Sequence, residues 1–237
     1  MRLPTPAELL AVWERGQGQP PVQQALLLLA VAHPESPADD LLNLPIGRRD
    51  AALLTLREWL FGPQVEGAAR CPACGQQLEL SFSTTDIRCG PKTMNELIVV
   101  VADRELRFRL PTSADLLAVA NGAEPDTAQR ALAAQCLLDE AAAPVLALDT
   151  LNAIAARMAE ADPQAEVQLA LTCPDCGHHW MALFDIVGFL WSEINTWAQR
   201  MLREVHTLAS AYGWREADIL ALSPLRRQRY LQLVRGL

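Results

Sequence analysis

The chain has 237 residues, 51% of them apolar and 20% charged, so it can bury one or two cores and is too hydrophobic for a disordered protein. A net charge of -8 argues against a dedicated nucleic-acid-binding protein, which needs a broad basic surface, and leaves room for a local basic patch. The N-terminal sequence lacks signal-peptide order, and the longest apolar run, residues 25–32, is far shorter than a membrane span of roughly 20 residues. We therefore expect a cytoplasmic protein that makes no membrane contact.

A motif near the N-terminus recurs in the middle of the chain. The sequences LPTPAELLAV, at residues 3–12, and LPTSADLLAV, at residues 110–119, share eight of ten residues. Farther along, residues 44–75 align without gaps on residues 146–177, with nine of 32 positions identical. We interpret the chain as two copies of one unit, because two such matches in the same order along the chain indicate an internal repeat.

The sequence of the first copy predicts three helices followed by a strand. Thr5 can cap a helix, and Pro4 ends whatever precedes it. The hydrophobic spacing predicts helices over residues 6–16, 20–33 and 47–61. A strand is then predicted at residues 78–82, directly after a pair of cysteines.

A predicted hairpin separates the copies, and the second copy repeats the order of elements in the first. Two extended runs on either side of residues 102–104 predict a β-hairpin. Thr112 can cap the next helix. The predicted elements of the second copy are helices over residues 113–121, 126–140 and 148–161 and strands at 165–171 and 180–184.

The C-terminal segment has no counterpart in the first copy. Apolar residues spaced by three and four predict one long helix over residues 186–212, which Gly213 ends. A short helix is predicted over residues 214–222, and Ser223-Pro224 predicts the start of a last helix that runs to about Arg235.

These elements predict an α+β fold that is mostly helical. It consists of an internally duplicated helix bundle with a zinc-ribbon-like β unit and a C-terminal helical extension. The expected domains are a first repeat at residues 1–90, a hairpin with the second repeat at 91–188, and a helical tail at 189–237.

Four cysteines occur in two CPxCG motifs, which favours metal binding over disulfides. Zinc prefers four thiolate or imidazole ligands, and a CxxC turn supplies two of them. The predicted ligands of one structural Zn²⁺ are Cys71, Cys74, Cys173 and Cys176. The 98 residues between Cys74 and Cys173 exceed the spacing of an ordinary zinc ribbon. If the copies pack about a pseudo-twofold axis, however, equivalent motifs meet there and share one ion.

A rival arrangement has two separate sites. His178 or His179 would then join the second cysteine pair, and Cys89 would join the first, although each set lacks a fourth ligand. In the shared-site arrangement the two histidines are polar neighbours of the metal ligands. Cys136, in a helix rich in alanine and leucine, is predicted to be a small core residue.

The sequence does not predict an enzyme or a small-molecule substrate, because no GxSxG, HExxH, P-loop or GxGxxG motif occurs. The C-terminal helices instead combine aromatic and basic residues suited to core packing or a protein interface. The candidate partner-binding residues are Trp191, Trp197, His206, Tyr212, Trp214, Arg226, Arg227, Arg229 and Tyr230. The basic last helix predicts docking on an acidic surface of the protein itself or of a partner, with a helix-turn-helix nucleic-acid reader as the alternative.

The segment from Phe184 to Val234, with its YGW-x-x-x-x-IL-x-L-x-x-x-RR ending, resembles a family of bacterial proteins from phage-tail-like and contractile-injection gene clusters. LRFRLPTSADLLAVA and the CPxCG pair extend the resemblance over nearly the whole chain. A looser similarity connects it to the baseplate hub assembly chaperones of T-even-type phages.

The resemblance implies a non-enzymatic, zinc-stabilised component or assembly chaperone of a phage-tail-like baseplate. Its partners would be other baseplate or tail proteins, and it could be incorporated into a phage or phage-like particle. The competing prediction is a zinc-ribbon regulatory protein that binds nucleic acid through the basic helix at Arg226–Arg229.

Overall fold

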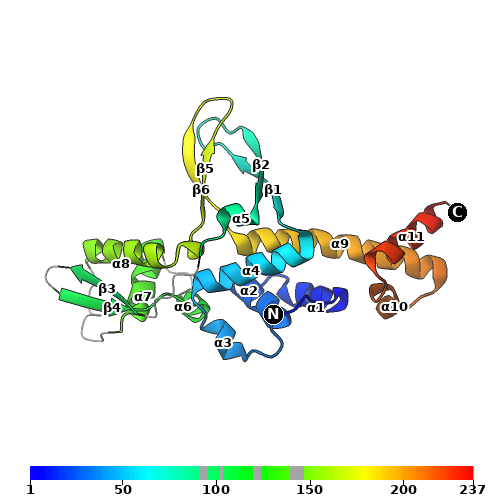
Figure 1. Cartoon of the computed structure of the whole chain (residues 1–237), viewed down its shortest axis with the longest axis horizontal. Helices are drawn as coiled ribbons and strands as arrows, with labels where there is room; N and C mark the ends of the chain where they lie inside the picture. The colour runs from blue at the N-terminus through cyan, green and yellow to red at the C-terminus, as the bar shows by residue number, and fades with distance from the viewer. Residues whose placement is uncertain (91–95, 102–103, 120–123, 139–146, 237) are drawn as a thin grey trace. The chain divides into compact units, whose positions relative to one another are not determined.

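The computed structural model describes residues 1–90, 96–101, 104–119, 124–138 and 147–236 of the chain (Figure 1). These residues form two compact units. One comprises Met1–Pro34 and Val187–Leu237, and the other comprises Glu35–Ile186. The three domains predicted from the sequence follow the repeated motifs rather than these units, and they stay a prediction.

The first unit is helical. Its elements are α1 (Pro6–Gly16), α2 (Pro21–Ala32), α9 (Ile186–Tyr212), α10 (Glu216–Leu220) and α11 (Pro224–Arg235). Thr5 begins α1 through a capping box, in which its hydroxyl accepts from the amide of Glu8 and the Glu8 carboxylate accepts from the amide of Thr5. Gly213 follows α9 with φ 68°, a left-handed conformation that favours glycine at a helix end.

One face of α9 provides much of the core of this unit. The buried cluster is composed of Leu10, Ala198, Met201, Val205, Leu208, Ile219, Leu220 and Leu231. The α9 members recur at intervals of three or four residues, so they lie on one side of the helix. Between α1 and α9, the Trp13 indole N–H donates to Asn195 Oδ1 at 2.9 Å, which gives a partly buried polar group a partner.

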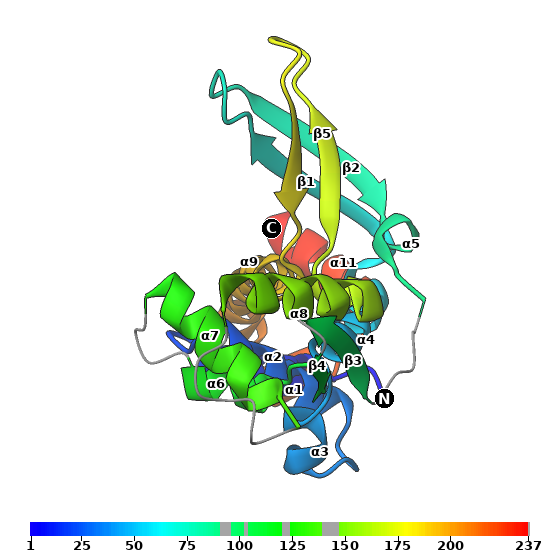
Figure 2. The same cartoon turned by 90° about the vertical axis from the view of Figure 1, so that its left-hand side faces the viewer.

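In its described residues, the second unit combines helices with three two-stranded antiparallel sheets. Its helices are α3 (Ala38–Leu42), α4 (Ile46–Phe61), α5 (Thr84–Ile87), α6 (Ser113–Val119), α7 (Pro125–Cys136) and α8 (Leu148–Ala161), with a 3₁₀ turn at Pro163–Ala165. Its hairpins are β1 (Gln64–Arg70) with β2 (Gln77–Ser83), β3 (Leu97–Val101) with β4 (Arg104–Phe108), and β5 (Gln168–Thr172) with β6 (His179–Leu183). Seen from a second side, the β1–β2 and β5–β6 hairpins extend from the same side of α4 and α8 (Figure 2).

A buried cluster joins the β3–β4 hairpin to α7 and α8. Its members are Leu97, Leu106, Phe108, Leu110, Ala133, Leu151, Ile154 and Ala161. Elsewhere in the unit, Asp162 caps α4 from a distant part of the chain by accepting the Gly47 amide at 2.8 Å. A Cβ at position 47 would clash with the Asp162 carboxylate, so this contact requires glycine there.

The structure confirms the mostly helical α+β fold with a zinc-ribbon-like unit, and it corrects several predicted boundaries. The predicted strand at 165–171 begins only at Gln168, because residues 163–165 form the 3₁₀ turn. The helix predicted at 214–222 spans Glu216–Leu220. Two short helices, α3 and α5, were not predicted. The turn at 102–103 and residues 120–121 and 139–140 of two predicted helices lie outside the described residues.

Candidate metal centre

Each of the β1–β2 and β5–β6 hairpins ends in a tight cysteine turn. In the first, the Cys71 amide donates to the Gln76 carbonyl at 2.8 Å, and the Gly75 amide donates to the Cys71 carbonyl at 2.9 Å. Gly75 has φ 77°, which a residue with a side chain adopts at a cost. The motif therefore closes into a rigid loop with both thiols held by the same turn.

The second turn repeats these contacts at the same separation along the chain. The Cys173 amide donates to the His178 carbonyl, and the Gly177 amide donates to the Cys173 carbonyl, both at 2.9 Å. Gly177 has φ 70°. Corresponding residues of the two hairpins, such as Cys71 and Cys173, are 102 positions apart.

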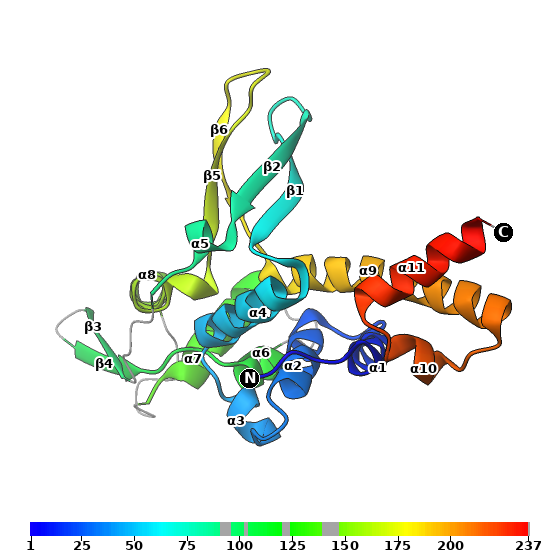
Figure 3. The same cartoon turned by 45° about the vertical axis from the view of Figure 1, so that its right-hand side comes forward.

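The two hairpins lie side by side (Figure 3). Their turns bring the four cysteines together. The four sulfurs all lie within 4.8 Å of one another. Sγ of Cys71 is 3.7 Å from Sγ of Cys176, and Sγ of Cys74 is 3.6 Å from Sγ of Cys173. A tetrahedral ion with metal–sulfur bonds of about 2.3 Å needs sulfur–sulfur edges of about 3.8 Å. The arrangement thus fits four-coordinate binding of one ion.

An apolar layer lies beneath two of the sulfurs. Cys71 and Cys173 are each 1% exposed and form a cluster with Leu78, against which the half-buried Trp180 packs. Leu78 and Trp180 occupy corresponding positions in the two hairpins. Cys74 and Cys176 are exposed, so each hairpin presents one buried and one exposed thiol to the site.

Neighbouring groups shift the pKa values of the Cys71, Cys74 and Cys176 thiols. Burial raises the pKa of the Cys71 thiol, but hydrogen bonds from the amides of Cys74 and Ala73 and from neighbouring thiols bring it down to about 7. For Cys74, the Gln76 amide lowers the pKa, whereas neighbouring sulfurs and burial raise it to about 12. Adjacent thiolates repel each other, and a bound cation would offset that repulsion.

The histidines and Cys89 of the rival two-site arrangement are not members of this four-cysteine cluster. The His179 ring is 2.8 Å from the Thr172 hydroxyl, and the His178 ring stacks on Trp180. Cys89 donates its amide to Gln164 Oε1 at 2.8 Å. Cys136 is fully buried, and this burial raises the pKa of its thiol to about 11, as expected for a core residue. Among the described residues, the four-cysteine set is the group that could hold a metal ion.

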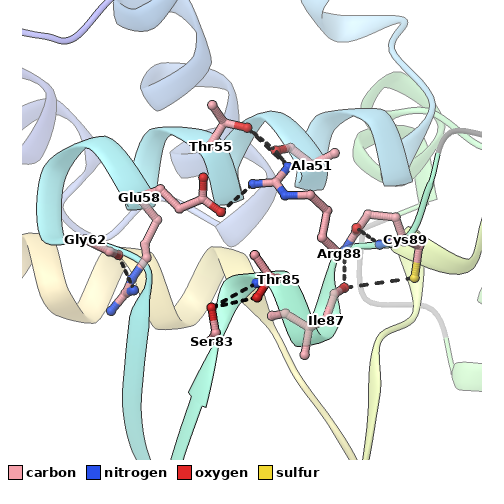
Figure 4. A network of polar contacts seen from close by, with 11 residues as sticks. Ala51, Thr55, Glu58, Gly62, Ser83, Thr85, Ile87, Arg88 and Cys89 are labelled. Carbon is pink, nitrogen blue, oxygen red and sulfur yellow. Dashed lines mark hydrogen bonds and ion pairs between the residues drawn. The ribbon is translucent and has the colours of Figure 1, made fainter.

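A polar network not predicted from the sequence fixes the base of the first hairpin to α4. Arg88, just after α5, forms an ion pair with Glu58 at 2.7 Å and contacts the Ala51 carbonyl and the Thr55 hydroxyl (Figure 4). The Ser83 hydroxyl accepts from the Thr85 amide and so caps α5 (Figure 4). The only sequence signal for this network was the polar composition of residues 83–88.

The candidate partner-binding aromatic residues are partly buried within the helical unit. Trp191 packs against Gly16, where a Cβ would overlap its ring. Tyr212 and Trp214 stack with ring centroids 4.7 Å apart, and Tyr230 contacts Trp214 edge to face at 4.8 Å. Tyr212, Trp214, Tyr230 and Trp197 all pack against the buried cluster that α9 provides in the helical unit. Their predicted contacts with a partner stay a prediction.

The basic and histidine candidates differ in exposure. Arg227 is 5% exposed, and its Nε donates to Glu204 of α9 at 2.7 Å, while its Nη1 donates to the Leu222 carbonyl. The last helix thus docks on an acidic group of its own unit. Arg226, Arg229 and His206 are exposed. Among the described residues, no helix has the length and apolar character needed to cross a membrane.

Comparison with known proteins assigns the chain to a family. The family model described as T4 bacteriophage base plate protein matches residues 17–139, just over half of the 237 residues. The match includes Cys71 and Cys74 and ends before Cys173 and Cys176. Neither the comparison with curated proteins nor that with solved structures gives a match. The chain belongs to the T4 bacteriophage base plate protein family.

Proposed function

We propose that this protein is a zinc-stabilised component or assembly factor of a phage-tail-like baseplate and acts by binding other proteins of that baseplate. The family match is the observation that carries the proposal. A baseplate protein works through contacts with neighbouring chains, and the family gives no reason to expect catalysis. The protein would accordingly be made in the cytoplasm and work in or on the assembling particle.

Zinc is the ion that best suits the cysteine cluster. Four thiolates at the corners of a tetrahedron match its preferred structural site, and all four positions would be taken by protein. Cys71, Cys74, Cys173 and Cys176 would hold the ion. A closed site has no position for water or substrate, so its contribution would be to hold the two hairpins together.

An internal duplication would explain why this site is shared between distant segments. Cys71 corresponds to Cys173 and Cys74 to Cys176, each pair being 102 positions apart. If each cysteine is replaced by its counterpart, the close Cys71–Cys176 pair becomes the close Cys173–Cys74 pair. A second correspondence supports the idea: Arg2 pairs with Glu8, and Arg109 pairs with Asp115 at the start of the second copy. We propose that two ancestral copies came to share one ion.

A gene deletion in the phage or injection-system cluster tests the role in assembly. Without the protein, we expect electron microscopy to show tails that lack a complete baseplate, and a plasmid copy should restore them. Quantitative mass spectrometry of purified wild-type particles then separates the two roles, because a component stays at fixed stoichiometry and a chaperone leaves. Intact, infectious particles from the deletion strain would refute the proposal.

Nucleic-acid binding through the last helix has less support. Arg227 is buried against Glu204, so its guanidinium cannot bind a phosphate while α11 stays docked. The exposed Arg226 and Arg229 provide a small basic patch on a chain of net charge -8. A salt-dependent shift of DNA or RNA by the purified protein would favour this alternative.

A further inference from the structure

A groove runs between the facing edges of the two cysteine hairpins. It has a volume of about 520 Å³ and is lined by Leu80–Phe82 of β2, by Asp86–Cys89, and by Pro163 with the continuous run Glu166–Leu171 at β5. A cavity over the face of a strand touches alternate residues, because side chains alternate between faces. Contact with every residue from 166 to 171 therefore means that the groove follows the edge of β5.

The hydrogen-bond register shows which main-chain groups point away from the β5–β6 pairing. The Phe184 amide donates to the Val167 carbonyl at 2.8 Å, and the Cys173 amide donates to the His178 carbonyl at 2.9 Å. In an antiparallel pair, alternate residues exchange these bonds, so Leu169 also faces β6. Gln168 and Ala170 consequently direct their main-chain N–H and C=O groups outward.

No main-chain hydrogen bond among the described residues uses the outward groups of Gln168 and Ala170. A strand edge with free donors and acceptors can pair with another extended chain. The stretch of six residues from 166 to 171 is about 17 Å long at a rise of about 3.3 Å per residue. It offers room for a strand of five or six residues.

The charges around the groove favour a different protein over a second copy of this chain. Asp86 and Glu166 are exposed at the lining, and neither carboxylate belongs to an ion pair among the described residues. The Asp86 carboxylate accepts from the Ser83 amide, and the Glu166 carboxylate accepts from the Gln168 side chain, so each keeps its negative charge without a cation beside it. Arg88, which also lines the groove, is paired with Glu58. A second copy has a net charge of -8 and would be repelled, whereas a segment with lysine or arginine near these carboxylates would be attracted.

We infer that this groove binds an extended, basic segment of a partner protein, which pairs as a third strand with the edge of β5. The partner's main chain would bond to Gln168 and Ala170, and its alternate side chains would contact the half-buried Phe82 and Val167. The identification of the partner as a baseplate protein rests on the proposed function. The strand pairing does not, because purified protein can test it.

A proline substitution at the edge separates strand addition from folding. The Ala170 amide does not bond to β6, so Ala170→Pro removes an edge donor and obstructs an added strand while sparing the β5–β6 ladder. Ala68, the corresponding alanine of β1, also points its main chain away from its own hairpin, because the Thr84 amide donates to the Pro63 carbonyl and fixes the same alternation. Ala68 does not line the groove, so Ala68→Pro is the matched control.

The probe is a blocked nonapeptide of alternating valine and threonine with lysine at both ends, studied with the full-length, metal-loaded protein. Two further versions carry N-methyl groups, one on the odd-numbered residues and the other on the even-numbered residues. Each version therefore lacks the N–H donors along one edge of the extended peptide. Binding is measured by calorimetry, and metal content and melting temperature are measured for each variant.

We expect saturable binding that weakens at least tenfold in Ala170→Pro and remains unchanged in Ala68→Pro. One N-methyl register should weaken binding to the wild-type protein more than the other, and this comparison holds even if Ala170→Pro fails to fold. No saturable binding, equal effects of both prolines, or equal effects of both registers would overturn the inference. So would a wild-type dimer that Ala170→Pro dissociates, because the edge would then serve a second copy. None of these results would refute the proposed baseplate function, which the deletion experiment tests separately.

Discussion

Phe82 and Phe184 pack edge to face, with ring centroids 5.6 Å apart and planes at 83°, although they lie in different hairpins. They are corresponding residues, separated by the same 102 positions as Cys71 and Cys173. In a pair of hairpins related by a twofold axis, a residue near that axis contacts its own counterpart. The phenylalanine pair and the sulfur cluster therefore support a local pseudo-twofold relation between the hairpins.

Loss of one thiol should open the metal site. In Cys173→Ser, three thiolates remain, and we expect the zinc content to fall from one ion per chain to nearly none at a zinc concentration that saturates the wild type. Elemental analysis after dialysis measures this change. Cys89→Ser is the matched control, because Cys89 lies outside the sulfur cluster and should leave the metal content unchanged. Retention of a full ion by Cys173→Ser would contradict the shared site.

The close contact between Gly16 and Trp191 predicts that α1 tolerates no larger residue at its end. Gly16→Ala places a methyl group within the Trp191 ring, and overpacking of this kind costs about 1–3 kcal/mol of unfolding free energy. Trp191→Leu in the same chain should recover part of that loss. Thermal and urea denaturation measure the change, with Gly90→Ala as the control because its Cβ meets no neighbouring atom. Equal stability of both alanine variants would argue against the packing.

The sequence predicted the long helix α9 better than it predicted what covers the aromatic side chains of the C-terminal helices. The apolar spacing of residues 186–212 predicted α9 and its single apolar face correctly, because helical periodicity depends on the sequence alone. The same spacing does not say whether the face is covered by the chain itself or by another protein. Spacing alone therefore could not show that Trp197 and Tyr230, the proposed partner contacts, also pack on the core of their own unit.

The cysteine cluster that could hold a metal ion was predictable from its two turns, but the contacts around it were not. CPxCG specifies a tight turn and two ligands within five residues, whereas the pairing of Cys71 with Cys176 depends on segments a hundred residues apart. Only the repeated motif indicated that they meet. No comparable pattern marks Asp162 as the cap of α4 or Arg88 as the partner of Glu58, since each contact depends on where distant segments pack.

The buried ion pair between Arg227 and Glu204 should hold α11 on α9. The two side chains are 6% and 11% exposed, so Glu204→Leu leaves a buried guanidinium without its partner, at a cost of about 3–5 kcal/mol. Arg227→Leu combined with Glu204→Leu should regain most of that stability. Urea denaturation measures both variants. Arg226→Leu, at an exposed neighbour, should change stability by no more than about 0.5 kcal/mol. A similarly small effect of Glu204→Leu would show that the pair does not hold the helix.

The contact between Arg2 and Glu8 predicts a specific loss of stability in acid. Hydrogen bonds from the Arg2 guanidinium and the Thr5 amide lower the pKa of Glu8 from 4.5 to about 2. A lowered pKa means that the folded state binds fewer protons than the unfolded state, so the stabilisation is complete above about pH 4.5 and is lost as the pH falls towards 2. The melting-temperature difference between wild type and Glu8→Gln should shrink between pH 6 and pH 3. Glu14→Gln, on the same helix, controls for the loss of one charge.

Zinc-edge X-ray absorption of the purified protein, combined with its zinc-to-protein ratio, tests the shared metal site most directly. We predict one ion per chain with four sulfur neighbours at about 2.3 Å and no nitrogen or oxygen ligand. Two ions per chain, a mixed sulfur and nitrogen shell, or metal-free protein with cysteine disulfides would contradict the account in which one ion joins the two hairpins.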